Sequence, residues 1–174
     1  MKTLQYYEKA ILRNGLEVVF RAARPEDAER MVEAFKELEA SSIYTRLFSP
    51  KKEITEAELQ RFRETDFDTL VRLLCTIERD GREIVIGSGI YAKVSADSAE
   101  VAFVVEEDYQ RLGISKRLLI HLREIALANG IKNFSAEVLP YNSAMLGVFQ
   151  SCGWPMKSRT SDGTVHITLD LEHA

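Results

Sequence analysis

The chain has 174 residues, with 23 lysines and arginines against 27 aspartates and glutamates, so its formal net charge is −4. Hydrophobic residues make up 45% and charged residues 29%, as in ordinary globular domains. The acidic balance argues against a binder of nucleic acid, and two cysteines are too few for a disulfide framework or a zinc cluster. The composition therefore predicts one soluble, cytoplasmic domain over residues 1–174, with residues 1–15 as a peripheral segment and with neither metal nor membrane contact.

The first elements are predicted to be a hairpin followed by helices. Asn14-Gly15 is a turn signal within residues 11–23, and the apolar and β-branched residues after it favour a strand. Pro25 suits the first position of a helix, and the acidic residues Glu26 and Asp27 follow at the positive end of the helix dipole. Two further helices are expected, over residues 41–48 and, from a capping box, over about 55–63.

The rest of the chain alternates predicted strands with two helices. Turn signals between apolar runs predict strands over residues 70–78, 83–94, 100–105 and 134–139, and a terminal hairpin around 161–163. An amphipathic helix follows Gly113 and ends at Asn129-Gly130, and a shorter helix covers 143–150. This order predicts a mixed α/β (α+β) domain whose sheet is largely antiparallel and flanked by helices.

The segment from Val101 to Arg117 is the most informative for chemistry. A buried strand runs through a short loop into a helix start, where backbone N–H groups lack intrahelical partners and can bind an anion. Arg111, Lys116 and Arg117 cluster there although the dipole disfavours cations, and an anionic ligand would offset the conflict. The alternative is a solvated surface loop in which Gly113 serves only flexibility, and these residues alone leave both interpretations open.

The same loop resembles a known cofactor-binding motif. Residues 110–115, Gln-Arg-Leu-Gly-Ile-Ser, are similar to the Q/R-x-x-G-x-G/A pyrophosphate loop of the GNAT superfamily of acyl-CoA N-acyltransferases. Asn142 with Gly153-Trp154 matches that superfamily's N…G-F pattern, with Trp in place of Phe. Residues 21–27, 42–50 and 136–145 are similar to bacterial protein lysine acetyltransferases of the Pat type. The resemblance covers about residues 16–155 and implies the GNAT fold, with a splayed sheet at the acetyl-CoA site.

The resemblance also implies how acetyl-CoA, the expected cosubstrate, is bound without a metal. Its pyrophosphate is expected on the amides of residues 111–115, and its pantetheine arm on the free strand edge near Val104 and Val105. Asn142 is expected near the pantetheine or thioester, and its residue type also suits a helix N-cap. The implied cofactor-binding residues are Phe103, Val104, Val105, Gln110, Arg111, Leu112, Gly113, Ile114, Ser115, Lys116, Asn142 and Met145.

Acyl transfer to an amine needs a base, because a free lysine has a pKa of about 10.4 and is protonated near neutral pH. Glu100 is the candidate for this role. It lies in an otherwise apolar strand, and it aligns with the strand glutamate that the resembling Pat-type enzymes use as general base. The alternative is an exposed glutamate at the end of a strand.

Two residues depart from the family pattern. Ser115 stands at the last small position of the loop, where Gly or Ala is usual; its hydroxyl suits a phosphate oxygen but adds bulk. Phe149 stands where many GNAT enzymes place a tyrosine that protonates the leaving thiolate. Tyr141 and Tyr91 are candidate substitutes, although a thiolate leaves readily near neutral pH without an acid.

These residues predict an N-acetyltransferase in which an amine attacks acetyl-CoA directly within a ternary complex. A protein lysine is the expected acceptor, with an acyl-CoA ligase as one candidate partner. Two alternatives stay open: a small-molecule amine N-acetyltransferase, and a catalytically silent acyl-CoA-sensing module in which Phe149 and Ser115 would be signs of decay. The sequence leaves acyl-chain preference, regulation and oligomeric state, a dimer included, undetermined.

Overall fold

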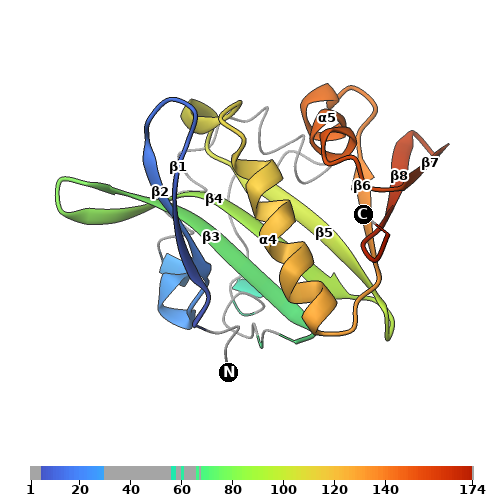
Figure 1. Cartoon of the computed structure of the whole chain (residues 1–174), viewed down its shortest axis with the longest axis horizontal. Helices are drawn as coiled ribbons and strands as arrows, with labels where there is room; N and C mark the ends of the chain where they lie inside the picture. Colours follow the sequence, from blue (N-terminus) through green and yellow to red (C-terminus); the bar gives the residue numbers. More distant parts are fainter. Residues whose placement is uncertain (1–4, 30–55, 58–59, 61–65, 67, 174) are drawn as a thin grey trace.

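The computed structural model describes residues 5–29, 56–57, 60, 66 and 68–173, and these form an eight-stranded sheet of order β1-β2-β3-β4-β5-β6-β8-β7 (Figure 1). The strands are β1 (Tyr7–Ile11), β2 (Glu17–Ala22), β3 (Leu70–Arg79), β4 (Arg82–Lys93), β5 (Ser98–Val105), β6 (Asn133–Val138), β7 (Met156–Ser161) and β8 (Thr164–Asp170). The helices among the described residues are η2 (Pro25–Asp27) and η3 (Glu107–Tyr109), both 3-10, and α4 (Ile114–Ala128) and α5 (Ser143–Ser151).

Neighbouring strands pair antiparallel except β5 and β6, which confirms the predicted mixed, largely antiparallel sheet. Asp80 and Gly81 turn the chain between β3 and β4 with φ of 54° and 75°, the left-handed pair that matches the twist of a two-residue hairpin. The predicted start at Pro25 is also confirmed, as η2. The helices expected over 41–48 and 55–63 fall wholly or largely outside the described residues.

Helix α4 covers the middle of the sheet across one face (Figure 1). Its buried side is apolar, as its periodicity predicted, and packs on β3, β4 and β5; it comprises Ile114, Leu118, Leu119, Leu122, Ile125 and Ala126. Two glycines of β4 let α4 approach closely: an added Cβ would lie 3.2 Å from the Ile114 Cγ2 at Gly87 and 3.3 Å from the Leu118 Cβ at Gly89. Because Gly87 pairs with Val105, the first of these contacts brings the start of α4 close to the end of β5.

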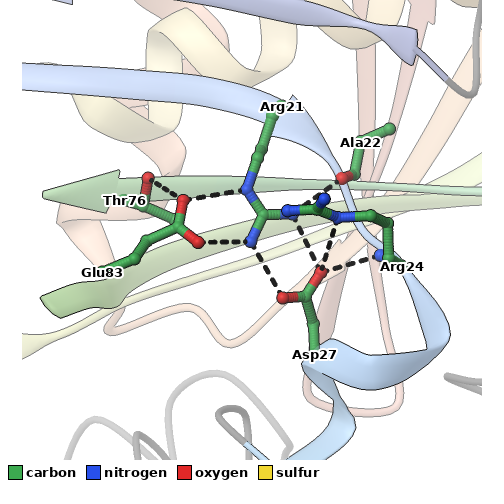
Figure 2. A network of polar contacts seen from close by, with 6 residues as sticks. All are labelled: Arg21, Ala22, Arg24, Asp27, Thr76 and Glu83. Atoms are coloured by element: carbon green, nitrogen blue, oxygen red, sulfur yellow. Dashed lines mark hydrogen bonds and ion pairs between the residues drawn. The ribbon is translucent and has the colours of Figure 1, made fainter.

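A buried ion network fastens β2 and η2 to the β3–β4 hairpin (Figure 2). The Arg21 guanidinium, 3% exposed, donates to both carboxylate oxygens of the fully buried Asp27 at 2.8 Å. It also donates to Glu83 at 2.9 and 3.0 Å, and the Thr76 hydroxyl donates to the same Glu83 carboxylate. The Arg24 N–H donates to Asp27 at 2.8 Å. Burial alone would raise the pKa of Asp27, but the bonds from Arg21 and Arg24 hold it below the ordinary value.

Asp66 organises the turn that leads into β3. Its carboxylate accepts from the backbone N–H groups of Asp68, Thr69 and Leu70, each at 2.9 Å, and from the Thr69 hydroxyl at 2.6 Å. Partial burial opposes ionisation, yet these four bonds lower the pKa of Asp66 to about 2.

Replacing this carboxylate is expected to loosen the start of β3. Asp66→Ala should lower the free energy of unfolding by about 1 kcal/mol at pH 7, as loss of a comparable cap does. Because the folded pKa lies below the ordinary 3.8, this stabilisation is present above pH 3.8 and is lost as the pH falls through about 2. Urea denaturation of both proteins between pH 7 and pH 2 measures the difference, and a gap that widens on acidification would contradict this role.

Candidate active site

A gap in the sheet lies between β5 and β6. The two strands pair in parallel only from Ser98 with Asn133 to Glu100 with Ser135, whereas β5 continues along β4 as far as Val105. Beyond Glu100 they diverge toward the end of the molecule where α4 begins and α5 lies (Figure 1). The predicted splay of the sheet is therefore present at the predicted strand.

Two backbone hydrogen bonds fix which residues of β5 face the gap. The Val94 N–H donates to the Ser98 carbonyl at 2.9 Å, and the Glu106 N–H donates to the Ile86 carbonyl at 2.8 Å. Backbone polar groups alternate sides along a strand, so the even-numbered residues of β5 face β4 and the odd-numbered ones face β6. The open edge is therefore formed by the backbone of Phe103 and Val105. The backbone of Val104, which was expected at this edge together with Val105, faces β4 instead, although Val104 is among the residues that line the cavity.

Gln110 holds the loop to the end of this edge. Its side-chain amide donates to the Val105 carbonyl at 3.1 Å, so that carbonyl already has a donor while the Val105 N–H faces the gap. This contact fixes the distance between the strand edge and the loop that follows it. The sequence pointed to Gln110 as a cofactor residue, and the structure gives its side chain a role in positioning the loop.

The loop ends at a helix terminus that has no side-chain cap. Gly113 is the N-cap of α4 with φ 86° and, as a glycine, makes no side-chain capping bond. The first backbone bond into the helix joins the Arg117 N–H to the Gly113 carbonyl at 3.1 Å, which leaves the N–H groups of residues 114–116 without intrahelical acceptors. Arg111 also has a positive φ of 67°, a conformation that non-glycine residues adopt rarely.

The gap and the helix terminus open into one cavity of about 810 Å³, a size suited to a cofactor. Its walls come from β5, the following loop, β6 and α5. Eleven of the twelve expected cofactor residues line it: Phe103, Val104, Val105, Gln110, Arg111, Gly113, Ile114, Ser115, Lys116, Asn142 and Met145. Leu112 does not, because its side chain packs against the hydrophobic core.

Three cations gather at the helix end of the cavity. Arg111 and Lys116 lie there as expected, and Arg13, from the turn between β1 and β2, joins them. Within the part of the chain that the structure describes, no carboxylate pairs with any of the three. Arg117, predicted to belong to this cluster, does not line the cavity; its guanidinium lies 3.5 Å from the Ile11 carbonyl.

Asn142 lies opposite the strand edge, at the start of α5. Its side-chain oxygen accepts from the Met145 N–H at 3.2 Å, so it is the N-cap of this helix. It also lines the cavity. The residue therefore both caps α5 and borders the cavity.

Glu100 lies at the other end of the cavity, on the last residue of β5 that pairs with β6. Its side chain is exposed, and Glu137 of β6 lines the same region. The Glu137 carboxylate lies 3.4 Å from the His166 ring. One end of the cavity thus carries cations and a helix terminus, and the other end carries two carboxylates.

A family model for the acetyltransferase (GNAT) family matches residues 20–154. The chain belongs to the GNAT family of acetyltransferases. The crystal structure of the GNAT domain of S. lividans PAT is 32% identical, with a TM-score of 0.86, over 94% of this chain and 96% of that one. The acetyltransferase PA5475 of Pseudomonas aeruginosa is 26% identical over 88% of this chain and 83% of its own. The acetyltransferase Pat of Mycolicibacterium smegmatis is 31% identical over 82% of this chain but only 42% of its own length.

Neither of the two tyrosines considered as substitutes for the general acid, Tyr91 and Tyr141, lines this GNAT cavity. Phe149 lines the cavity, buried, with its ring centroid 6.2 Å from that of Phe103. Tyr141 is 58% exposed and Tyr91 is fully buried, and neither lines the cavity. Tyr109 does line it, and sequence reasoning missed this residue; its hydroxyl contacts the Arg79 guanidinium.

The two cysteines of the GNAT chain are not activated as nucleophiles, because the pKa of each thiol is raised. Cys75 is buried in the core, and burial raises the pKa of its thiol to about 12. Burial also raises the pKa of Cys152.

The described residues contain no group of three or more His, Cys, Asp or Glu side chains placed to hold a metal ion. They also contain no helix that is both long enough and apolar enough to cross a membrane.

Proposed function

We propose that this GNAT acetyltransferase transfers the acetyl group of acetyl-CoA to a lysine side chain of a protein. The observation that carries the proposal is the single cavity that joins an uncapped helix N-terminus to an unpaired strand edge. Acetyl-CoA has the matching chemistry, because its phosphates are anions and its pantetheine arm carries amides that pair like a peptide strand.

The phosphates are assigned to the helix end of the cavity. The N–H groups of residues 114–116 and the side chains of Arg111 and Lys116 supply donors and positive charge there. Ser115 at the second helical position adds a hydroxyl to the same donors. The pantetheine amides are assigned to the open backbone groups of Phe103 and Val105, which lead the thioester toward Glu100.

Glu100 is the proposed general base. It takes a proton from the lysine ammonium, directly or through water, and the neutral nitrogen attacks the thioester carbonyl. The new C–N bond forms and the C–S bond breaks, so coenzyme A leaves as its thiolate, and the remaining proton that the attacking nitrogen loses on becoming an amide passes to water. Phe149 offers no proton, so this scheme relies on the thiolate as a leaving group that needs no acid. No covalent enzyme intermediate is involved.

A protein lysine is favoured as acceptor by similarity and by charge. S. lividans PAT and M. smegmatis Pat, both above 30% identity, resemble this chain over most of its length. Glu100 and Glu137 place two carboxylates at the end of the cavity where the acceptor enters, and carboxylates attract an ammonium group. The chain spans less than half of M. smegmatis Pat, so the proposal covers the transfer step and not that protein's regulation.

Acceptor choice is tested with acetyl-CoA and two sets of amines, a purified acyl-CoA ligase and a panel of small amines. Thiol release is followed together with the mass of each acceptor. We expect thiol release that depends on the ligase and matches its gain of acetyl groups on lysine. Faster turnover of a small amine would favour a small-molecule acetyltransferase, and tight acetyl-CoA binding with no transfer to either set would favour a sensor.

A further inference from the structure

The turn between β1 and β2 places Arg13 at the cavity although the sequence separates it from every motif of the site. Leu12 anchors the turn with its side chain buried in the core. Backbone bonds join the Leu12 N–H to the Leu16 carbonyl at 2.9 Å and the Gly15 N–H to the Leu12 carbonyl at 2.8 Å. The Leu16 N–H donates to the Asn14 side chain at 3.1 Å. These contacts give Arg13 a defined position.

The hairpin is also fastened to α4, the helix whose N-terminus borders the cavity. The Tyr6 hydroxyl, just before β1, contacts the His121 ring on α4. Arg117, on the first turns of α4, approaches the Ile11 carbonyl at the end of β1. Strand β1 is therefore held against α4 at both of its ends, and the contact at Ile11 is the one next to the turn that carries Arg13.

The guanidinium of Arg13 lies directly against the helix N-cap. Its Nη2 would be 3.3 Å from a Cβ added to Gly113. The positive end of a helix dipole disfavours a cation at this place, and the described residues offer Arg13 no carboxylate partner. Arg111 and Lys116, to which the described residues likewise offer no carboxylate, add two more cations to the same end of the cavity. An anion bound between the helix terminus and the hairpin turn would offset this repulsion.

We propose that Arg13 binds a phosphate group of coenzyme A, so that the β1–β2 turn forms a second wall of the phosphate site opposite the loop of residues 110–115. This inference rests on the proposed function, because it takes the bound anion to be acetyl-CoA. Arg13 acts on the affinity of the cosubstrate and not on the acetyl transfer, since the carboxylates lie at the other end of the cavity.

The test compares Arg13→Gln with Arg82→Gln, which removes an exposed arginine that directly follows another hairpin turn, outside the cavity. Calorimetric titration with acetyl-CoA is expected to show about a tenfold higher Kd for Arg13→Gln and a change below twofold for Arg82→Gln, as for loss of a charged hydrogen bond. Arg13→Lys should recover part of the affinity. At saturating acetyl-CoA the kcat of Arg13→Gln should equal that of the wild type.

Acetyl-dephospho-CoA, which lacks the 3′-phosphate, identifies the group that Arg13 contacts. If the increase in Kd caused by Arg13→Gln disappears with this ligand, Arg13 contacts the 3′-phosphate. If the increase persists, Arg13 contacts the diphosphate. Either result supports the proposal. A Kd within twofold of the wild type for Arg13→Gln with acetyl-CoA overturns it, as does a lower kcat at saturation. Failure of the wild type to bind acetyl-CoA is a different result, since it removes the proposed function and this inference with it.

Discussion

Glu100→Gln is expected to lower kcat by about 10²–10⁴-fold, the range for loss of a general base. The glutamine keeps the size of the side chain but cannot accept the proton of the lysine ammonium. The Kd for acetyl-CoA should stay within twofold, because Glu100 lies at the end of the cavity away from the helix terminus and its cations. Stopped-flow or steady-state thiol release, together with titration of acetyl-CoA, measures both quantities.

The pH dependence of this variant separates a base from a structural residue. A lysine has a pKa of about 10.4, so its neutral fraction rises about tenfold per pH unit from pH 7 to 10. Without a base the reaction depends on this fraction, and the deficit of Glu100→Gln should shrink as the pH rises. Glu137→Gln is the matched control, since it removes the other carboxylate at this end, and its kcat should fall by less. Full activity of Glu100→Gln at pH 7 would exclude Glu100 as the base.

Asp27→Asn is expected to lower the free energy of unfolding by about 3–5 kcal/mol. The carboxylate is fully buried and takes two 2.8 Å bonds from Arg21, and the variant leaves that guanidinium partly uncompensated in the interior. Glu26→Gln removes the exposed carboxylate of the preceding residue and should change the stability by less than about 0.5 kcal/mol. Urea denaturation followed by circular dichroism provides the comparison.

The same network has a predictable response to acid. Because the folded pKa of Asp27 lies below the ordinary value, its contribution to stability is present above pH 3.8 and is lost as the pH falls through the lower folded pKa. The difference between the wild type and Asp27→Asn should therefore narrow below pH 3.8. Equal stability of the two proteins at pH 7 would show that Glu83 alone compensates Arg21.

Helix α4 and the β3–β4 turn could be predicted because each is determined by residues that lie close together in the sequence. The apolar spacing of Leu118, Leu122 and Ile125 predicted α4, and the Asp80-Gly81 pair predicted the β3–β4 turn, because both signals concern residues close together in the chain. The start of β1 at Tyr7 was not predicted, since this edge strand is mostly exposed and carries little apolar alternation.

Contacts between distant segments escaped prediction. The sequence placed Asp27 as an acidic residue in the first turn of a helix. The structure also buries it against Arg21, which links it to Glu83 on another strand. Arg13 reaches the cavity only through the tertiary fold, and nothing in its neighbouring residues marks it, whereas Tyr109 directly precedes the loop of residues 110–115 and could have been included with it. The backbone register of β5 likewise keeps Val105 at the open edge but replaces Val104 with Phe103, because adjacent residues of a strand face opposite sides.

A crystal structure of the chain with acetyl-CoA tests the proposed site most directly. We expect phosphates against the N–H groups of residues 114–116, pantetheine amides paired with the backbone of Phe103 and Val105, and the acetyl group directed toward Glu100. Acetyl-CoA bound outside this cavity, or bound in it with the thioester at the helix end, would contradict the proposed binding mode.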